Sequence, residues 1–148
     1  MIEQTTKAPW HLWVVGVLTL IFNAGGVIDY TMSQLRNRAY LEMSGADYDV
    51  MIGWIESFPV WAHGFWALGT WGAFIGSLLL LFRSRHAVTA FLLSIIGLIG
   101  TSIAQFLFVE TPEELQSPGM IVFSIVIVVV TVGLYFYSRA MAARGVLR

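Results

Sequence analysis

The sequence lacks cysteine and contains few charged residues. Its 148 residues include eight Lys and Arg and nine Asp and Glu, so that 11% of the chain is charged. Without cysteine the chain forms no disulfide, thiolate metal site or thiol-based catalytic centre. A soluble domain usually carries about 25% charged residues. Because 11% is too little to coat a globule of this size, we expect lipid to surround much of its apolar surface.

Hydrophobic residues make up 57% of the chain and gather in four long stretches. A helix that crosses a membrane needs about 20 mainly apolar residues. Four stretches reach this length, over residues 10–30, 60–82, 87–109 and 120–138. The strands of a membrane barrel alternate apolar and polar residues, but the run Ile121–Val130 does not. The sequence therefore predicts an all-α integral membrane four-helix bundle, formed as one domain over residues 1–148.

The first connection, residues 31–57, is too long and too amphipathic for a simple loop. It begins with apolar residues spaced to continue the first span, Leu35, Ala39 and Met43. Ser44, with Asp47 three residues later, resembles the capping box of a second helix. That helix would carry an apolar face formed by Val50, Met51, Trp54 and Ile55. We expect a short amphipathic helical segment lying at the membrane interface. In the last connection, residues 111–114 have the proline and acids of a helix start.

The basic residues predict an orientation for the four spans. Six of them fall on one side of a four-span topology, namely Lys7, Arg83, Arg85, Arg139, Arg144 and Arg148. Arg36 and Arg38 fall on the other side. Because Lys and Arg are enriched in cytoplasmic loops, both chain termini are predicted to be cytoplasmic.

Polar side chains suggest a binding site in the outer half of the bundle. Small and polar residues recur along each span at intervals of three, four or seven, which places them on one helix face. In the predicted topology, the larger polar side chains of three helices fall in the outer leaflet. A pocket open to the outer side would be lined by Asn23, His63 and Gln105 and rimmed by Asp29, Tyr30 and Trp66. Polar groups within spans usually face the bundle interior or a water-filled cavity.

Two of these residues, His63 and Asp29, also have a purely structural interpretation, whereas Asn23 and Gln105 lie too deep to reach water at the helix end. Besides lining a pocket, His63 is equally well explained as a core histidine that donates to a carbonyl group. Asp29 is equally well explained as a carboxylate at the end of a helix, which reaches water and pairs with Arg36 or Arg38. The glycines of the second span, Gly69, Gly72 and Gly76, permit close helix packing. They are compatible both with packing inside one chain and with the contact surface of a homo-oligomer.

These features bear on three classes of function. A polar pocket with aromatic rims suits a transporter, or a transporter subunit, for a small polar solute such as a sugar. An accessory or structural protein that binds lipid or a membrane partner is the alternative. For an enzyme, no nucleophile or oxyanion-binding set accompanies His63 and Asp29. His11 and His63 fall in opposite leaflets, which disfavours haem ligation between them. The sequence thus predicts no cofactor, no metal site and, lacking a basic patch, no nucleic-acid partner.

Several segments carry a resemblance to a known family. They are residues 9–13 (PWHLW), 22–26 (FNAGG), 29–33 (DYTMS), 58–61 (FPVW), 66–72 (WALGTWG) and 143–148 (ARGVLR). These segments resemble an uncharacterised family of small four-span proteins of proteobacterial inner membranes, whose members are often labelled generically as sugar transporters. The resemblance covers nearly the whole chain. It implies a four-helix fold and a bacterial inner-membrane location.

Overall fold

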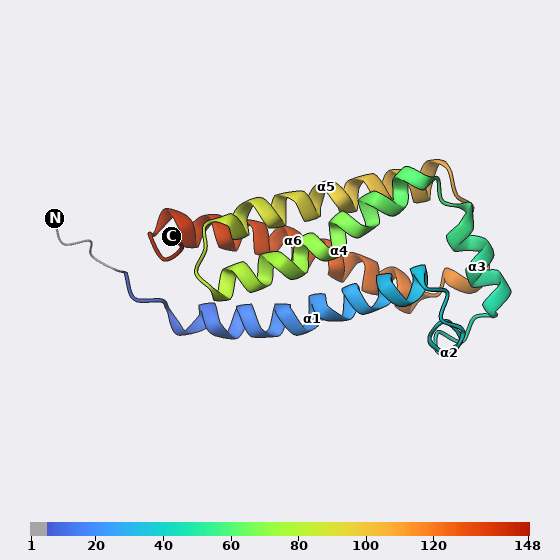
Figure 1. Cartoon of the computed structure of the whole chain (residues 1–148), viewed down its shortest axis with the longest axis horizontal. Coiled ribbons are helices and arrows are strands. Elements are labelled where there is room, and N and C mark those ends of the chain that lie inside the picture. The colour runs from blue at the N-terminus through green and yellow to red at the C-terminus, as the bar shows by residue number, and fades with distance from the viewer. Residues whose placement is uncertain (1–5) are drawn as a thin grey trace.

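The computed structural model describes residues 6–148, and every regular element in that range is helical (Figure 1). The elements are α1 (Trp10–Gln34), α2 (Arg38–Glu42), α3 (Tyr48–Ser57), α4 (Val60–Leu81), α5 (His86–Leu107), the 3-10 turn η1 (Glu113–Leu115) and α6 (Pro118–Ala143). Of these, α1, α4, α5 and α6 are long and apolar enough to cross a membrane. They run lengthwise side by side, which confirms the predicted four-helix bundle of a multi-pass membrane protein.

The two ends of the bundle differ in their content. One end, called the terminal end here, holds the first described residue, Thr6, the C-terminus and the turn between α4 and α5 (Figure 1). The opposite end, called the cap end, holds α2, α3 and η1. At the cap end, α3 lies across the long axis of the bundle. Its buried Met51 and Ile55 pack with Leu41 of α2 and Leu115 of η1. The predicted amphipathic segment is therefore confirmed as α3.

Two local predictions at the cap end were wrong, and a third was correct only in part. The first helix does not continue through Leu35 to Met43, because Arg36 adopts a left-handed conformation with φ of 52° and ends it. Asp47, rather than Ser44, caps α3, and its carboxylate accepts from the backbone N–H of Asp49 at 2.9 Å. Residues 111–114 lead into a single 3-10 turn, and α6 starts only at Pro118 after Ser117 caps it.

The closest helix contact joins α4 and α5. Ser94 Oγ of α5 donates a hydrogen bond of 2.6 Å to the carbonyl oxygen of Gly69 on α4. A Cβ atom built on Gly72 would lie 3.1 Å from the backbone nitrogen of Ser94, and one on Gly76 would meet the ring of Phe91. Gly69, Gly72 and Gly76 thus contact α5 of the same chain. An oligomer through them stays a prediction, and it would have to share this surface.

Polar side chains join α1 to α4. Asn23 Nδ2 donates to the carbonyl oxygen of Ala73 at 3.2 Å and to Ser77 Oγ at 2.9 Å. Ser77 Oγ in turn donates to Thr19 Oγ1 at 3.3 Å. Two turns toward the terminal end, a Cβ atom on Gly16 would lie 2.5 Å from Leu81. Because these residues all contact their counterparts on the antiparallel α4, the predicted polar face of the first span is a helix-packing face.

All four long helices meet at the terminal end. Their shared core consists of Leu12, Leu80, Ala87, Phe91, Leu134 and Met141, together with Val146 and Leu147 of the C-terminal tail. The tail turns back at Gly145, whose φ is +70°. Its backbone is tied to the α4–α5 turn, since Arg148 N donates to the carbonyl oxygen of Arg83 at 2.7 Å and Arg85 N donates to that of Arg148 at 2.8 Å.

Candidate functional site

The six residues predicted to form a polar pocket fall into separate local contacts. Asn23 is buried at the middle of α1, where its amide is engaged by α4. Ala73, its partner, lies ten residues beyond His63 along α4, or about 15 Å at about 1.5 Å per residue. The structure therefore does not bring Asn23 and His63 together.

The remaining five residues lie closer to the cap end. His63 Nδ1 is 2.9 Å from Gln34 Nε2, which links α4 to the end of α1. With Nδ1 as the acceptor, the ring proton of a neutral His63 lies on Nε2. One turn deeper, Tyr30 and Trp66 pack edge to face, with ring centroids 5.2 Å apart. Gln105 is half-buried near the end of α5.

Asp29 does not form the ion pair considered for it. Its carboxylate accepts a hydrogen bond of 3.1 Å from the hydroxyl group of Tyr40 on α2. Arg36 instead pairs with Glu56 at 2.8 Å. Arg38 pairs with Glu42, also at 2.8 Å. Asp29 thus holds the short helix α2 against the end of α1.

The hollowed part of the bundle lies elsewhere, beside α6. In the half of α6 near the termini, buried residues recur at intervals of three and four, namely Thr131, Leu134, Ser138 and Met141. The same spacing continues to Ile127 and Ser124, but Ser124 is exposed. Over residues 121–129, every residue except Ile127 is exposed. The helix therefore leaves the bundle near Val130, although its sequence pattern continues.

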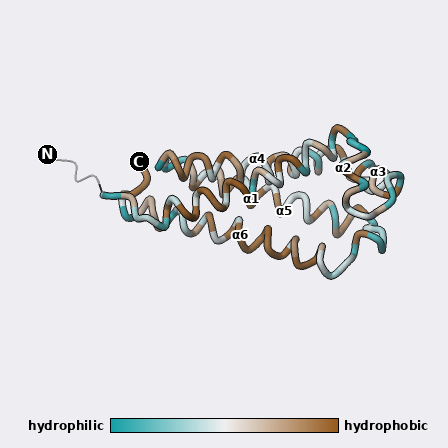
Figure 2. Tube along the Cα trace, turned by 90° about the horizontal axis from the view of Figure 1, so that it is seen from below, coloured by the Kyte–Doolittle hydropathy of each residue, from teal (hydrophilic) through white to brown (hydrophobic). Residues whose placement is uncertain are grey.

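Figure 2 shows the course of α6 from a second direction. The helix lies close to the others near the termini and stands apart from them toward the cap end. Its first turn returns to the bundle, because Met120 packs against the cluster formed by Leu41, Met51, Ile55 and Leu115. Along its exposed half, the rings of Phe22 and Phe123 lie 6.2 Å apart and connect α6 to α1. α6 is thus attached at both ends and separated from α5 between them.

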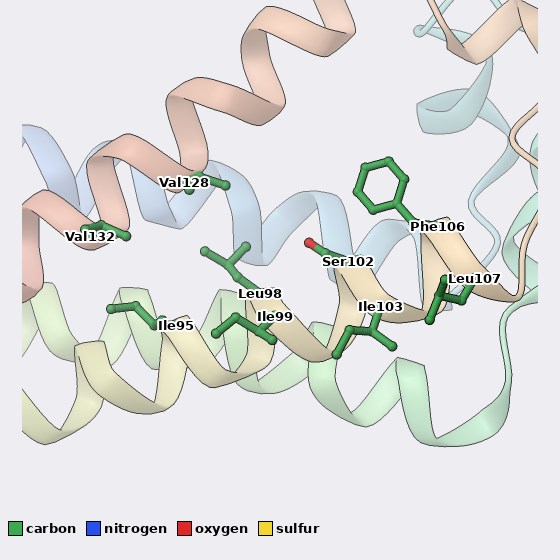
Figure 3. A pocket seen from close by; sticks show the side chains of 9 residues that line it. All are labelled: Ile95, Leu98, Ile99, Ser102, Ile103, Phe106, Leu107, Val128 and Val132. Atoms are coloured by element: carbon green, nitrogen blue, oxygen red, sulfur yellow. The ribbon is translucent and has the colours of Figure 1, made fainter.

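A cleft of about 530 Å³ occupies the space between α5 and α6 (Figure 3). Seven of its lining residues come from α5, namely Ile95, Leu98, Ile99, Ser102, Ile103, Phe106 and Leu107. Val128 and Val132 of α6 face them across the gap. Apart from the Ser102 hydroxyl group, the lining side chains are hydrocarbon. Because it lies between two membrane helices, the cleft opens sideways, where the bilayer would be.

The amino-acid sequence does not reveal this cleft. Val128 and Val132 lie in the β-branched run of α6, and the α5 residues belong to a helix that is apolar on nearly all sides. Neither pattern distinguishes a lining residue from one that faces lipid. The only available signal was the continuous spacing from Ser124 to Ser138, which predicted burial along the whole helix and was wrong for its first half.

A metal site finds no support in the described range. Residues 6–148 contain no group of three His, Asp or Glu side chains close enough to hold a metal ion. His11 lies near Tyr137 at the terminal end, with its Nδ1 atom 2.5 Å from the phenol oxygen. Since His63 lies at the cap end, the two histidines are at opposite ends of the bundle.

The comparisons with known proteins add no family to this description. No family model matches the chain, and neither a curated protein nor a solved structure is detectably similar to it. The resemblance of its segments to the four-span proteobacterial family stays a prediction.

Proposed function

We propose that this protein is a non-catalytic accessory protein of a membrane, which takes one chain of a lipid into the cleft between α5 and α6. The observation that carries the proposal is the separation of α6 from α5 next to a lining of seven α5 residues. Genuinely apolar cavities remain dry, so water does not fill such a cleft. A lipid chain fits its chemistry and reaches it directly from the bilayer.

The binding energy would come from packing. Lipid tails are as apolar as leucine, so transfer from bilayer to cleft brings no hydrophobic gain. A chain held on two sides by branched side chains gains additional van der Waals contacts. The exposed half of α6 would gain the same contacts in return. Bound lipid should therefore stabilise the position of α6.

Lipid retention tests the proposal. Val128 lines the cleft, whereas its neighbour Val129 is 64% exposed and does not line it. Val128→Trp should fill the cleft and reduce the number of lipids retained by the purified protein in native mass spectrometry. Val129→Trp adds the same side chain outside the cleft and should leave that number unchanged. Equal retention by both variants contradicts the proposal.

The proposed location is a bacterial inner membrane, with the terminal end in the cytoplasm. The orientation is supported by the six Lys and Arg residues assigned to that side, where Glu3 is the single acidic residue of segments 1–20, 76–92 and 131–148. Reporter fusions at Asp47 and, through a spacer, after Arg148 test it. A periplasmic signal from the fusion after Arg148 would reverse the orientation.

A second candidate is transport of a small polar solute, such as a sugar. It is favoured by the aromatic pair of Tyr30 and Trp66 and by the half-buried Gln105, all in the half of the bundle near the cap end. Gln105→Leu should then reduce solute uptake by reconstituted protein without lowering its thermal stability. Unchanged uptake in that variant removes Gln105 from this function.

A further inference from the structure

We infer that the lipid bound in the α5–α6 cleft belongs to the leaflet at the cap end and carries an ammonium headgroup without net negative charge. This inference rests on the proposed lipid binding and adds the class of ligand. It follows from the length of the cleft and from the charges at its edge.

The length of the cleft matches one leaflet. From Ile95 to Leu107 its lining covers about 18 Å of α5, at about 1.5 Å per residue. The hydrocarbon core of a bilayer is about 30 Å thick, so one leaflet contributes about 15 Å. Toward the terminal end, α6 packs against the bundle through the buried Leu134 and Ser138, so the cleft ends beyond Val132. A chain inside it therefore has its headgroup at the cap end.

The edge of the cleft at the cap end is acidic. The connection from α5 to α6, residues 108–117, begins directly after Leu107, the last lining residue of α5, and so leaves the cleft at this edge. It carries three exposed carboxylates, Glu110, Glu113 and Glu114, and no Lys or Arg. These charges would repel the phosphate of an anionic lipid and attract an ammonium group nearby.

The basic residues of the cap end are already engaged. The basic residues within segment 21–75 are Arg36 and Arg38. Arg36 is paired with Glu56 and Arg38 with Glu42, at 2.8 Å in each case. Arg38 also lies over the ring of Tyr48, 4.9 Å from its centroid. A phosphate at the edge of the cleft would therefore meet carboxylates rather than a free guanidinium group.

The test compares phosphatidylethanolamine with phosphatidylglycerol carrying identical acyl chains. Protein from equimolar mixed micelles is analysed by native mass spectrometry. The lipid lost on Val128→Trp, but not on Val129→Trp, is the lipid of the cleft. We expect it to favour phosphatidylethanolamine by about two- to fivefold, the ratio provided by an exposed ion pair.

Removing the carboxylates should remove this preference. In the triple variant with Glu110→Gln, Glu113→Gln and Glu114→Gln, the ratio should fall close to one while the number of bound lipids stays the same. Asp49→Asn neutralises an exposed carboxylate of α3, outside this connection, and should leave the ratio unchanged.

The possible results separate the two proposals. If Val128→Trp retains as much lipid as the wild type, the proposed lipid binding is wrong. If it loses lipid that is not enriched in phosphatidylethanolamine, the cleft binds lipid but the headgroup inference is overturned. A preference that persists in the triple variant also overturns it, because the carboxylates would not be its cause.

Discussion

Gly97 of α5 lies directly against Gly69 of α4, so closely that a Cβ atom on Gly97 would be 2.3 Å from the Gly69 backbone nitrogen. No side chain fits at this distance, and the carbonyl oxygen of Phe65 would be only 2.6 Å from the same Cβ atom. The pair of α4 and α5 is therefore the part of the bundle with the least freedom to adjust.

Gly97→Ala should destabilise the protein by about 1–3 kcal/mol, because α4 and α5 must separate to accept the methyl group. Unfolding by increasing SDS in mixed micelles measures the change in free energy. Gly133→Ala on α6 is the matched control, since a Cβ atom there meets nothing within 4 Å. Equal stability of the two variants would contradict the close contact of α4 and α5.

Asn23→Ala should cost about 1 kcal/mol, because it removes two hydrogen bonds between α1 and α4 that average about 0.6 kcal/mol each in membrane proteins. Unfolding by increasing SDS in mixed micelles again measures the change in free energy. Ser124→Ala serves as the control, because Ser124 Oγ donates only within its own helix, to Met120. Combined with Ser77→Ala, Asn23→Ala should be less than additive, since both variants remove one shared bond.

Asp47→Ala should destabilise α3 by about 1 kcal/mol through loss of its N-cap. Hydrogen exchange of the backbone amides of Val50 and Met51 should accelerate accordingly. Ser44→Ala should leave these amides unchanged, because Ser44 Oγ donates to Leu41 within the preceding helix. The reverse result would restore the capping box expected from the sequence.

Tyr40 should titrate at a higher pH than an ordinary tyrosine. Burial, followed by the charge of Asp29, raises its pKa above the usual 10.0. Because the folded-state pKa exceeds that of the unfolded chain, its contribution to stability is complete below pH 10.0 and is lost as the pH rises through the raised value. The ultraviolet absorbance of phenolate, measured against Tyr40→Phe, reports this titration.

Asp29→Asn provides the control for this shift. It removes the charge but leaves Tyr40 in place, so the pKa of Tyr40 should fall toward 10.0 without reaching it, because burial remains. An unchanged titration curve would mean that Asp29 does not influence Tyr40.

The length of the apolar stretches predicted the four spans, because any helix that crosses a bilayer needs enough apolar residues to span its hydrocarbon core. Two of the four helices end later than predicted, α1 at Gln34 and α6 at Ala143, whereas α4 ends at Leu81 and α5 at Leu107, one and two residues earlier than predicted. The span prediction rested on apolar residues alone, whereas helices continue past the apolar region until a residue such as Arg36 or Gly145 adopts a positive φ. The sequence gives little warning of this conformation at an arginine.

The candidate site was less predictable than the fold. Spacing placed Asn23 on an inward face, which is correct, but it cannot distinguish a pocket wall from a helix contact. Similarly, the spacing of Ser124, Thr131 and Ser138 is regular although α6 packs over only part of its length. The path of a helix depends on its neighbours, and periodicity within one helix does not contain that information.

The C-terminal tail limits where the chain tolerates an attached domain. Val146 and Leu147 are 3% and 2% exposed, and Arg83 Nε donates to the carbonyl oxygen of Val146 at 3.0 Å. A fluorescent protein or affinity tag fused directly after Arg148 would begin within this packed structure. Loss of expression from such a fusion would therefore reflect a displaced tail, and a flexible spacer should restore it.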